Sequence, residues 1–357
     1  MTDGLFHAVR PVLRTRGIVR EELGRDLIRL EIEEATDGLK TLCARFIAVG
    51  PNDEPAYLDG TLLDFGLDII VSVGPTSSAR TVFRGTISAL EATFDEAEAP
   101  EVAVYAEDRL MDLRMTRRTR SYDAMTDADI VREVASAHQL AVEVDIEDTT
   151  HEVVQQWNQS DLAFLRERAR LVRAELWLDD AGTLQFKARD RRSATELTLV
   201  RGGALLDLHA RADLAHQRTA VRVSGFDSDA RVAIDEEADD AVIRGEVSHG
   251  RTGPAILRQA FGERVSQRAR EVPLTTTEAA AVARAEMQRR ARRFVQVHGL
   301  TTGTPDMIVG TRLTLERVGR PFSGGGYHVT RVRHTHDLAR GFRTEFSAER
   351  PTLEEGA

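Results

Sequence analysis

The sequence predicts a β-rich α+β fold, in which two β-rich regions flank a smaller α/β insert. Three observations lead to this prediction. Residues 27–33 alternate strictly between apolar and charged side chains, which is the period of a half-buried antiparallel strand. The pattern changes to one with helices near Arg117, and strand-like segments return near Leu197. At 357 residues, the chain is long enough for two or three units, each with a core of its own.

The first β region covers residues 1–115. After 27–33, short apolar runs are separated by turn signals such as Gly74-Pro75 and Ala99-Pro100. These runs predict strands at 41–49, 68–73, 81–94 and 101–105. Short strands at nearly regular spacing are typical of a barrel or a sandwich.

Residues 116–196 are expected to form the α/β insert. Thr126 and Asp129 have the spacing of a capping box before a helix at 128–137, and residues 140–144 then have the pattern of a strand. After a polar connection, the stretch from Gln155 to Trp177 joins a helix start, a helix and a strand without a gap. It is the most informative stretch of the chain.

Within that stretch, Ser160 can cap a helix by accepting a hydrogen bond from a free backbone N–H, and Asp161 suits the positive first turn. Apolar side chains then return at helical spacing, at Leu162, Leu165, Ala169 and Val172. A hairpin follows, with strands expected at 175–178 and 183–188.

The second β region covers residues 197–350 and ends in a short tail, 351–357. Strands are expected at 204–210, 220–225, 312–318, 326–335 and 341–350. Helices are expected at 254–268 and, after the capping box Thr275 to Glu278, up to about Phe294. The acidic segment 227–240 lacks the glycine and ligand spacing of a calcium loop, so a solvated loop is expected. Gly324 to Gly326 precedes a strand instead of a helix, which favours a hairpin turn over a phosphate-binding loop.

Composition and charge restrict the class of protein. The chain has 41% hydrophobic residues and no apolar run near 20 residues, so we do not expect it to insert into a membrane. Its N-terminus lacks the features of a secretory signal, so synthesis and assembly in the cytoplasm are expected. The net charge of −10 argues against a nucleic-acid partner. The basic clusters 117–120, 189–192 and 289–293 are interpreted as solvated faces or subunit contacts.

No residue pattern points to catalysis, and we expect no catalytic, cofactor-binding or metal-binding residues. His334 and His336 lie on one face of a strand, but no third and fourth ligand stands at a recognisable spacing. Cys43 lies in an apolar run, which indicates a buried, inert thiol. Two alternatives remain open: a tail-associated cell-wall hydrolase that uses an acid pair, and an oligonucleotide-binding barrel, which would need a basic, aromatic face.

Three regions in order resemble the hub proteins of contractile tails, namely the phage late control D and VgrG N-terminal families. The first is 104–113, a strand that leads into the insert. The second is the stretch that ends at Trp177, with matching residues Asn158, Ser160, Asp161, Phe164 and Leu165. The third runs from the long helix through 303–306 and 310–311 to the closing hairpin, with matching residues Gly326, Tyr327, Val329, His334, Gly341, Phe342, Thr344 and Phe346. Phe342 stands where these families usually have Tyr.

The resemblance implies two related β-barrels per chain and a homotrimer, hence a pseudo-six-fold ring of barrels around a channel. Such a ring is expected to connect a hexameric inner tube to a trimeric spike, within the baseplate of a contractile phage tail or a related injection system. Its implied partners are the inner tube protein, the spike and other baseplate proteins, and it would become part of the tail or injection particle. Because this sequence ends at Ala357, soon after the closing hairpin, the spike is expected to be a separate protein.

Overall fold

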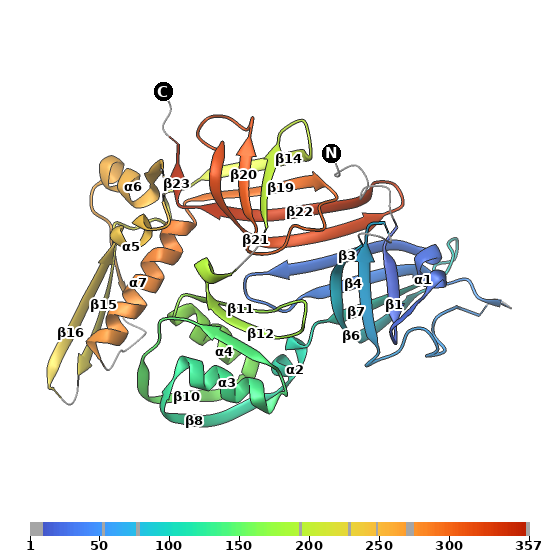
Figure 1. Cartoon of the computed structure of the whole chain (residues 1–357), viewed down its shortest axis with the longest axis horizontal. Coiled ribbons are helices and arrows are strands. Elements are labelled where there is room, and N and C mark those ends of the chain that lie inside the picture. The colour runs from blue at the N-terminus through green and yellow to red at the C-terminus, as the bar shows by residue number, and fades with distance from the viewer. Residues whose placement is uncertain are drawn as a thin grey trace.

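The computed structural model describes residues 10–51, 54–75, 79–192, 195–227, 230–247, 249–268 and 275–354. It is β-rich as predicted, with 49% of residues in strands and 21% in helices. Most strands form a long sheet along the top of the molecule in the view of Figure 1, the insert lies below it, and a hairpin arm projects at one end.

The first half of the long sheet is formed by the N-terminal strands. They pair antiparallel in the spatial order β3-β4-β7-β6-β5-β1-β2, and a short helix, α1 (Glu21–Asp26), precedes β3. The predicted alternation at 27–33 is confirmed, because Leu30 and Ile32 are buried in the core of this half. The strands are β1 (Val12–Thr15), β2 (Ile18–Val19), β3 (Leu27–Ala35), β4 (Thr41–Ile47), β5 (Asp68–Val73), β6 (Arg80–Thr93) and β7 (Glu101–Glu107).

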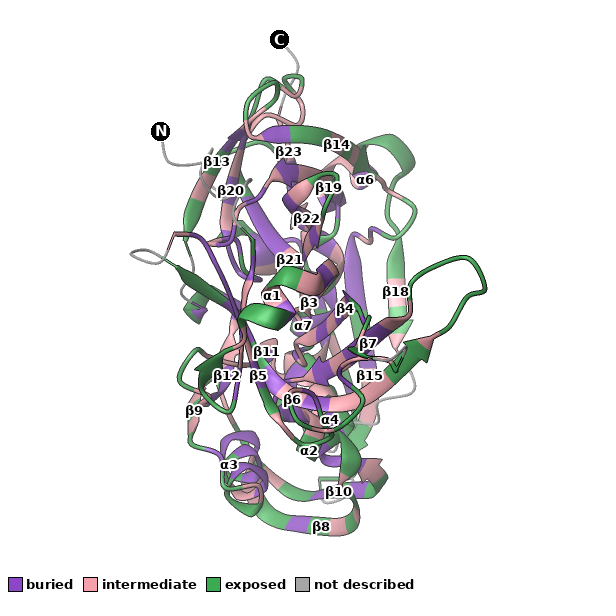
Figure 2. Cartoon of the chain, turned by 90° about the vertical axis from the view of Figure 1, so that its right-hand side faces the viewer, coloured by how far each residue is buried: buried purple, intermediate pink, exposed green. Residues whose placement is uncertain are grey.

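The second half repeats this arrangement of strands. Its order β14-β19-β22-β21-β20 has the same connectivity and the same antiparallel pairings as β3-β4-β7-β6-β5. Buried side chains alternate with less buried ones along β22, so one face packs on a separate core (Figure 2). The strands are β13 (Glu196–Val200), β14 (Leu205–Ala212), β19 (Val295–Thr302), β20 (Arg312–Glu316), β21 (Gly324–Asp337) and β22 (Gly341–Arg350).

The two halves share one continuous sheet of 13 strands. The C-terminal part of β21 pairs with β3, from Arg331 opposite Ala35 to Asp337 opposite Arg29. Ion pairs between Arg331 and Glu33 add to this junction. Within the described residues the strand pairings close neither half into a barrel, so the two barrels expected from the sequence are not confirmed.

The insert has a core of its own, in which the rings of Tyr122 and Phe164 stack with centroids 5.5 Å apart. The capping box of Thr126 and Asp129 is present as predicted. Strands β8 and β10 were not predicted, because their polar residues do not alternate clearly with apolar ones. The elements are α2 (Leu110–Met115), β8 (Arg117–Thr126), α3 (Asp127–Ala137), β9 (Val142–Asp145), β10 (Thr150–Ser160), α4 (Asp161–Leu171), β11 (Ala174–Leu178), β12 (Leu184–Ala188) and the 3-10 turn η2 (Arg189–Arg191).

The arm lies between β14 and β19 in the sequence. A small sheet is formed by three strands, β15 (Ala220–Asp227), β16 (Val232–Asp239) and β18 (Val265–Arg268). This sheet packs on α7 (Thr276–Arg292). Thr275 caps the N-terminus of α7, as predicted. Short elements connect the arm to the second half, namely α5 (Ala241–Arg244), β17 (Arg251–Thr252), α6 (Gly253–Phe261) and β23 (Thr352–Leu353).

Three predictions for this region were wrong. The acidic segment 227–240 is mostly strand β16, because Ile234 and Ala238 turn inward while Asp235 and Glu237 stay in solvent. The helix expected at 254–268 ends at Phe261, followed by Gly262 with φ of 73°, and the chain continues as β18. Gly324 to Gly326 begins β21 instead of forming a turn.

Candidate functional site

The cap of helix α4 is the first part of the predicted family motif. Ser160 Oγ accepts a hydrogen bond from the N–H of Ala163 over 3.2 Å, so Ser160 caps the helix as predicted. Phe164 and Leu165 are buried in the insert core. Asn158 lies at a bulge of β10 with φ of 42°, where its side-chain oxygen accepts from Arg117.

Asp161 does more than suit the positive end of the helix. It is fully buried and accepts hydrogen bonds from Arg118 at 2.9 Å, His138 at 2.8 Å and Gln156 at 2.8 Å. Burial raises the pKa of this carboxyl, but the hydrogen bonds from Gln156, His138 and Arg118 outweigh it and lower the pKa overall. Arg118 was interpreted as part of a solvated basic cluster, and the structure instead places it against this carboxylate.

The closing hairpin carries the second group of motif residues, on β21 and β22. Tyr327 is buried, donates to the carbonyl of Phe322 at 2.8 Å, and packs under the guanidinium of Arg350. His334 bonds Thr344 Oγ1 at 3.0 Å and stacks on Phe342. Four further motif residues lie in the same hairpin: Gly326, Val329, Gly341 and Phe346. The hairpin packs on the sheet cores and the α4 group on the insert core, so the fold does not gather the motif into one site.

The three cores meet at a buried polar junction. Arg192 lies over the ring of Trp177, and its guanidinium bonds Glu34 of β3 at 2.7 Å and Glu175 of β11 at 3.2 Å. Nearby, Lys40 contacts Glu34 at 3.1 Å, and Arg189 contacts Glu349 of β22 at 2.5 Å.

The sequence predicted that 189–192 would be a solvated face or a subunit contact, and this was wrong for Arg189 and Arg192. Arg189 and Arg192 are 7% and 4% exposed, because they join segments that are distant in the chain. Burial lowers the pKa of His328, which lies 3.3 Å from Glu175, to about 4. The ring is therefore neutral at pH 7, and Arg192 supplies the positive charge that compensates Glu175.

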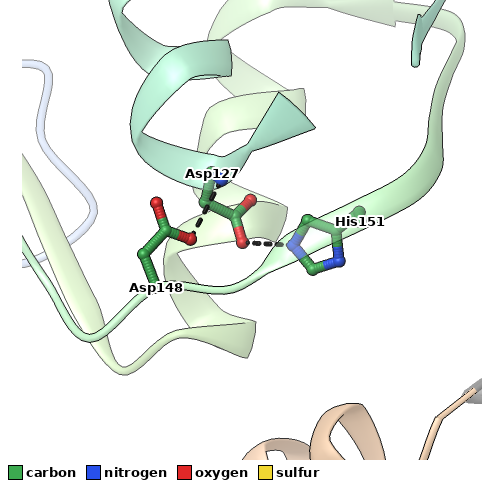
Figure 3. Close-up of side chains that lie close together, drawn as sticks. All are labelled: Asp127, Asp148 and His151. Carbon is green, nitrogen blue, oxygen red and sulfur yellow. Dashed lines mark hydrogen bonds and ion pairs between the residues drawn. The ribbon is translucent and has the colours of Figure 1, made fainter. Parts of the chain in front are cut away.

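A second charge cluster joins the insert to α7. Asp127 accepts two hydrogen bonds from Arg168, at 2.5 and 2.9 Å. It also accepts one from His151 at 2.9 Å (Figure 3). The other ring nitrogen of His151 lies 3.0 Å from Glu278 on α7. These two carboxylates raise the pKa of His151 to about 9, so the ring is a cation at neutral pH.

The same cluster contains the one group of side chains, within the described residues, that is compact enough to hold a metal ion: Asp127, Asp148 and His151. Its chemistry fits an ion-pair network better. Asp148 already accepts from the backbone N–H groups of Asp127 and Ala128, at the start of α3. A metal would have to displace the proton of His151 and compete with Arg168, because metal ligands must be deprotonated. His334 and His336 of the predicted strand face are buried near β3 and β22.

The hydrolase alternative requires a carboxylic acid with a raised pKa. Burial raises the pKa of Asp108 to about 6. Its two carboxylate oxygens, however, accept from the backbone N–H groups of Lys40 and Leu110, at 2.8 and 2.9 Å. Asp108 therefore fixes the entry of the chain into α2, and its position gives the hydrolase alternative no support. Cys43 is half-buried, and burial raises the pKa of its thiol.

The fold, with separate cores joined by buried polar junctions, resembles that of solved phage tail proteins. Over 96% of the chain, the structure resembles 99% of a 43 kDa tail protein of prophage MuSo2 from Shewanella oneidensis, with a TM-score of 0.73 and 15% identity. A tail protein from Neisseria meningitidis MC58 matches 96% of each chain, with a TM-score of 0.66 and 12% identity. An E. coli component of the type VI secretion system matches 97% of this chain and 79% of its own, with a TM-score of 0.57 and 16% identity.

The family is shown by the sequence itself. Residues 57–337 match the Alg8 N-terminal domain family, and the chain belongs to that family. No curated protein matches the sequence. Among the described residues, no helix is both long enough and apolar enough to cross a membrane.

Proposed function

We propose that this protein is a structural, non-enzymatic baseplate hub of a contractile phage tail or related injection system. Three copies would form a ring that connects a hexameric inner tube to a trimeric spike. The observation that carries this proposal is the repeated strand order of the two halves, β3-β4-β7-β6-β5 and β14-β19-β22-β21-β20. A chain with two equivalent units can present six similar units from three copies. The division at about residues 115 and 196 is part of the same proposal.

The junction inside the chain suggests how one chain would meet the next. In the second half, the N-terminal part of β21 pairs with β20, and its C-terminal part pairs with β3 of the first half. The equivalent strand of the first half is β6. Its N-terminal part pairs with β5, up to Thr86, but residues 88–93 have no strand partner on that side within the described chain.

The equivalent of β3 in the second half is β14. Among the described residues, β14 is an edge strand that pairs with β19, apart from a single bridge between Leu205 and Arg201. Its backbone groups are therefore largely open on one side. One face of the strand is exposed, and the other is partly buried, because Leu208 and Ala210 pack on the core of the second half. A long open edge is a template for pairing with another chain. Because β6 corresponds to β21 and β14 corresponds to β3, residues 88–93 of one chain would pair antiparallel with β14 of the next chain. This pairing would continue the sheet around the ring. Neighbouring chains would thereby supply the strand partners that residues 88–93 and β14 lack in a single chain.

Two measurements test this arrangement. Light scattering during gel filtration should give about three times the 39.6 kDa of one chain. Single cysteines placed at positions 88–93 and at 205–212, in a Cys43→Ser background, should form interchain disulfides on mild oxidation and yield dimer and trimer bands. Cross-linking should follow every second position, because neighbours along a strand point to opposite faces.

The matched control pairs positions 88–93 with cysteines on β16, which lies in the arm. A chain that stays monomeric at micromolar concentration, and that binds neither tube nor spike protein, would contradict the hub proposal. A trimer whose cysteines cross-link only in the control pairs would contradict the strand pairing alone.

A further inference from the structure

A recess of about 590 Å³ opens where α4, α7 and the two halves of the sheet meet. Its walls carry an unusual number of arginines for a chain of net charge −10. Seven arginines line it, against three carboxylates, Asp37, Glu175 and Glu349. The insert contributes Arg166, Arg170, Arg173 and Arg189, and α7 with the residue after it contributes Arg289, Arg292 and Arg293.

Five of these arginines are held in place by carboxylates. The three with the clearest pairs are Arg292, which is bidentate to Glu246, Arg189, which pairs with Glu349, and Arg289, which pairs with Glu286. Arg166 and Arg173 have acidic partners as well. These pairs fix the shape of the recess and reduce its positive charge.

Arg170 and Arg293 differ from the other five. Both are exposed, and among the residues that the structure describes neither side chain has a hydrogen-bond or ion-pair partner. They are the two free cations of the recess, one on the insert helix and one just after α7. The lining also includes small side chains, among them Ala169 and Ala285.

We propose that this arginine recess binds a short carboxylate-rich segment of a partner polypeptide. The planar guanidinium forms two parallel hydrogen bonds with a carboxylate, so free arginines at fixed positions select that group. The volume of the recess lies in the usual range of ligand-binding pockets. A nucleic-acid partner is disfavoured, because the remainder of this acidic chain would repel a long polyanion. The recess does not require the trimer, since one chain supplies all of it.

The test uses the full chain and a fluorescein-labelled hexaglutamate peptide, with binding followed by fluorescence anisotropy in 50 mM salt. We expect saturable binding that weakens as salt is raised to 200 mM, because the free arginines are exposed and therefore screened. The double variant Arg170→Ala/Arg293→Ala should lose about tenfold in affinity. The variant Arg170→Glu/Arg293→Glu should lose binding altogether.

The matched control is Arg84→Ala/Arg201→Ala, which removes two exposed arginines outside the recess and should keep wild-type affinity. No peptide binding at 50 mM salt, or an equal loss in the control, would overturn the proposal. Tighter binding of a six-nucleotide single strand that is lost in the same recess variants would also overturn it, in favour of a nucleic-acid site. Arg170 and Arg293 lie on neither β6 nor β14, so the recess variants should keep the oligomeric state of the wild type. Light scattering on each variant therefore separates loss of peptide binding from loss of the trimer.

Discussion

Arg192 donates a hydrogen bond from Nη2 to Oε1 of Glu34 over 2.7 Å, although 158 residues separate the two in the chain. The same guanidinium reaches Glu175 of the insert. One side chain at the end of the insert thus connects it to the first half of the sheet. Such a contact holds the insert and the first half of the sheet in a fixed arrangement.

Replacing Arg192 by Met should strongly destabilise the protein. The change keeps the length of the side chain but leaves Glu34 and Glu175 short of their compensating charge in a buried site. Removing one partner of a buried ion pair typically costs about 3–5 kcal/mol. We expect the urea midpoint to fall accordingly, as measured by circular dichroism.

Arg191→Met is the control for this change. Arg191 is the next residue along the chain, its side chain is 62% exposed, and its nearest carboxylate, Asp190, lies 3.9 Å away. Its loss should cost less than about 0.5 kcal/mol. Equal urea midpoints for the two variants would show that the junction contributes nothing to stability.

Stability should decrease between about pH 6.5 and pH 9 because of His151. Its pKa is about 9 in the folded chain, above the ordinary value of 6.5, since Asp127 and Glu278 stabilise the cation. Protonation therefore stabilises the fold fully below pH 6.5, and this contribution is lost as the pH rises through 9. A shift of this size corresponds to an upper limit of about 3 kcal/mol.

Urea titrations at pH 6, 7.5 and 9 would measure this dependence. In His151→Gln the decrease should be much smaller, whereas the exposed His216→Gln should retain the wild-type decrease. An unchanged pH profile in His151→Gln would rule out this histidine as the link between the insert and α7.

Much of the fold could be predicted from the sequence, because local patterns determine it. The strand at 27–33 alternates cleanly, and Thr126 with Asp129 and Ser160 form caps that involve only a few neighbouring residues. The wrong predictions have a physical cause too. In β16, acidic side chains occupy the solvent face and dominate the composition, so the two inward apolar residues, Ile234 and Ala238, were not recognised as one face of a strand.

The polar junctions could not be predicted in this way. His151 and Glu278 are 127 residues apart, and Arg189 and Glu349 are 160 apart. An arginine that pairs in a buried junction looks the same in the sequence as one in solvent, because its partner is fixed only by the tertiary fold. The repeat of strand order was not visible in the residue pattern, because the two halves share connectivity without sharing such a pattern. Two related units were expected only from the resemblance to the tail-hub families.

On the acid side, His334 should destabilise the fold as the pH falls. Burial, with a smaller effect from the charge of Lys40, lowers its pKa to about 4 in the folded chain. Between pH 6.5 and 4 the unfolded chain takes up a proton that the folded chain does not, so the free energy of unfolding decreases with falling pH. His334→Asn should be less stable at pH 7, since it loses the stacking on Phe342. Its urea midpoint should nevertheless fall less than that of the wild type between pH 6.5 and 4, and a steeper fall would contradict the assignment.

Gly303 should tolerate no side chain, because it lies directly against Phe342. A Cβ at this position would be 2.4 Å from Cδ1 of the ring and 2.9 Å from the carbonyl oxygen of Phe342. The backbone carbonyl is fixed by a hydrogen bond from the N–H of Gly303 at 3.1 Å, so neither neighbour can move away freely. Overpacking of this kind typically costs about 1–3 kcal/mol, and we expect Gly303→Ala to lower the thermal midpoint by several degrees. Gly245→Ala is the matched control, since a Cβ there would meet nothing within 4 Å and the backbone is helical. If both variants melted at the same temperature, the close approach of Gly303 to Phe342 would not limit this position.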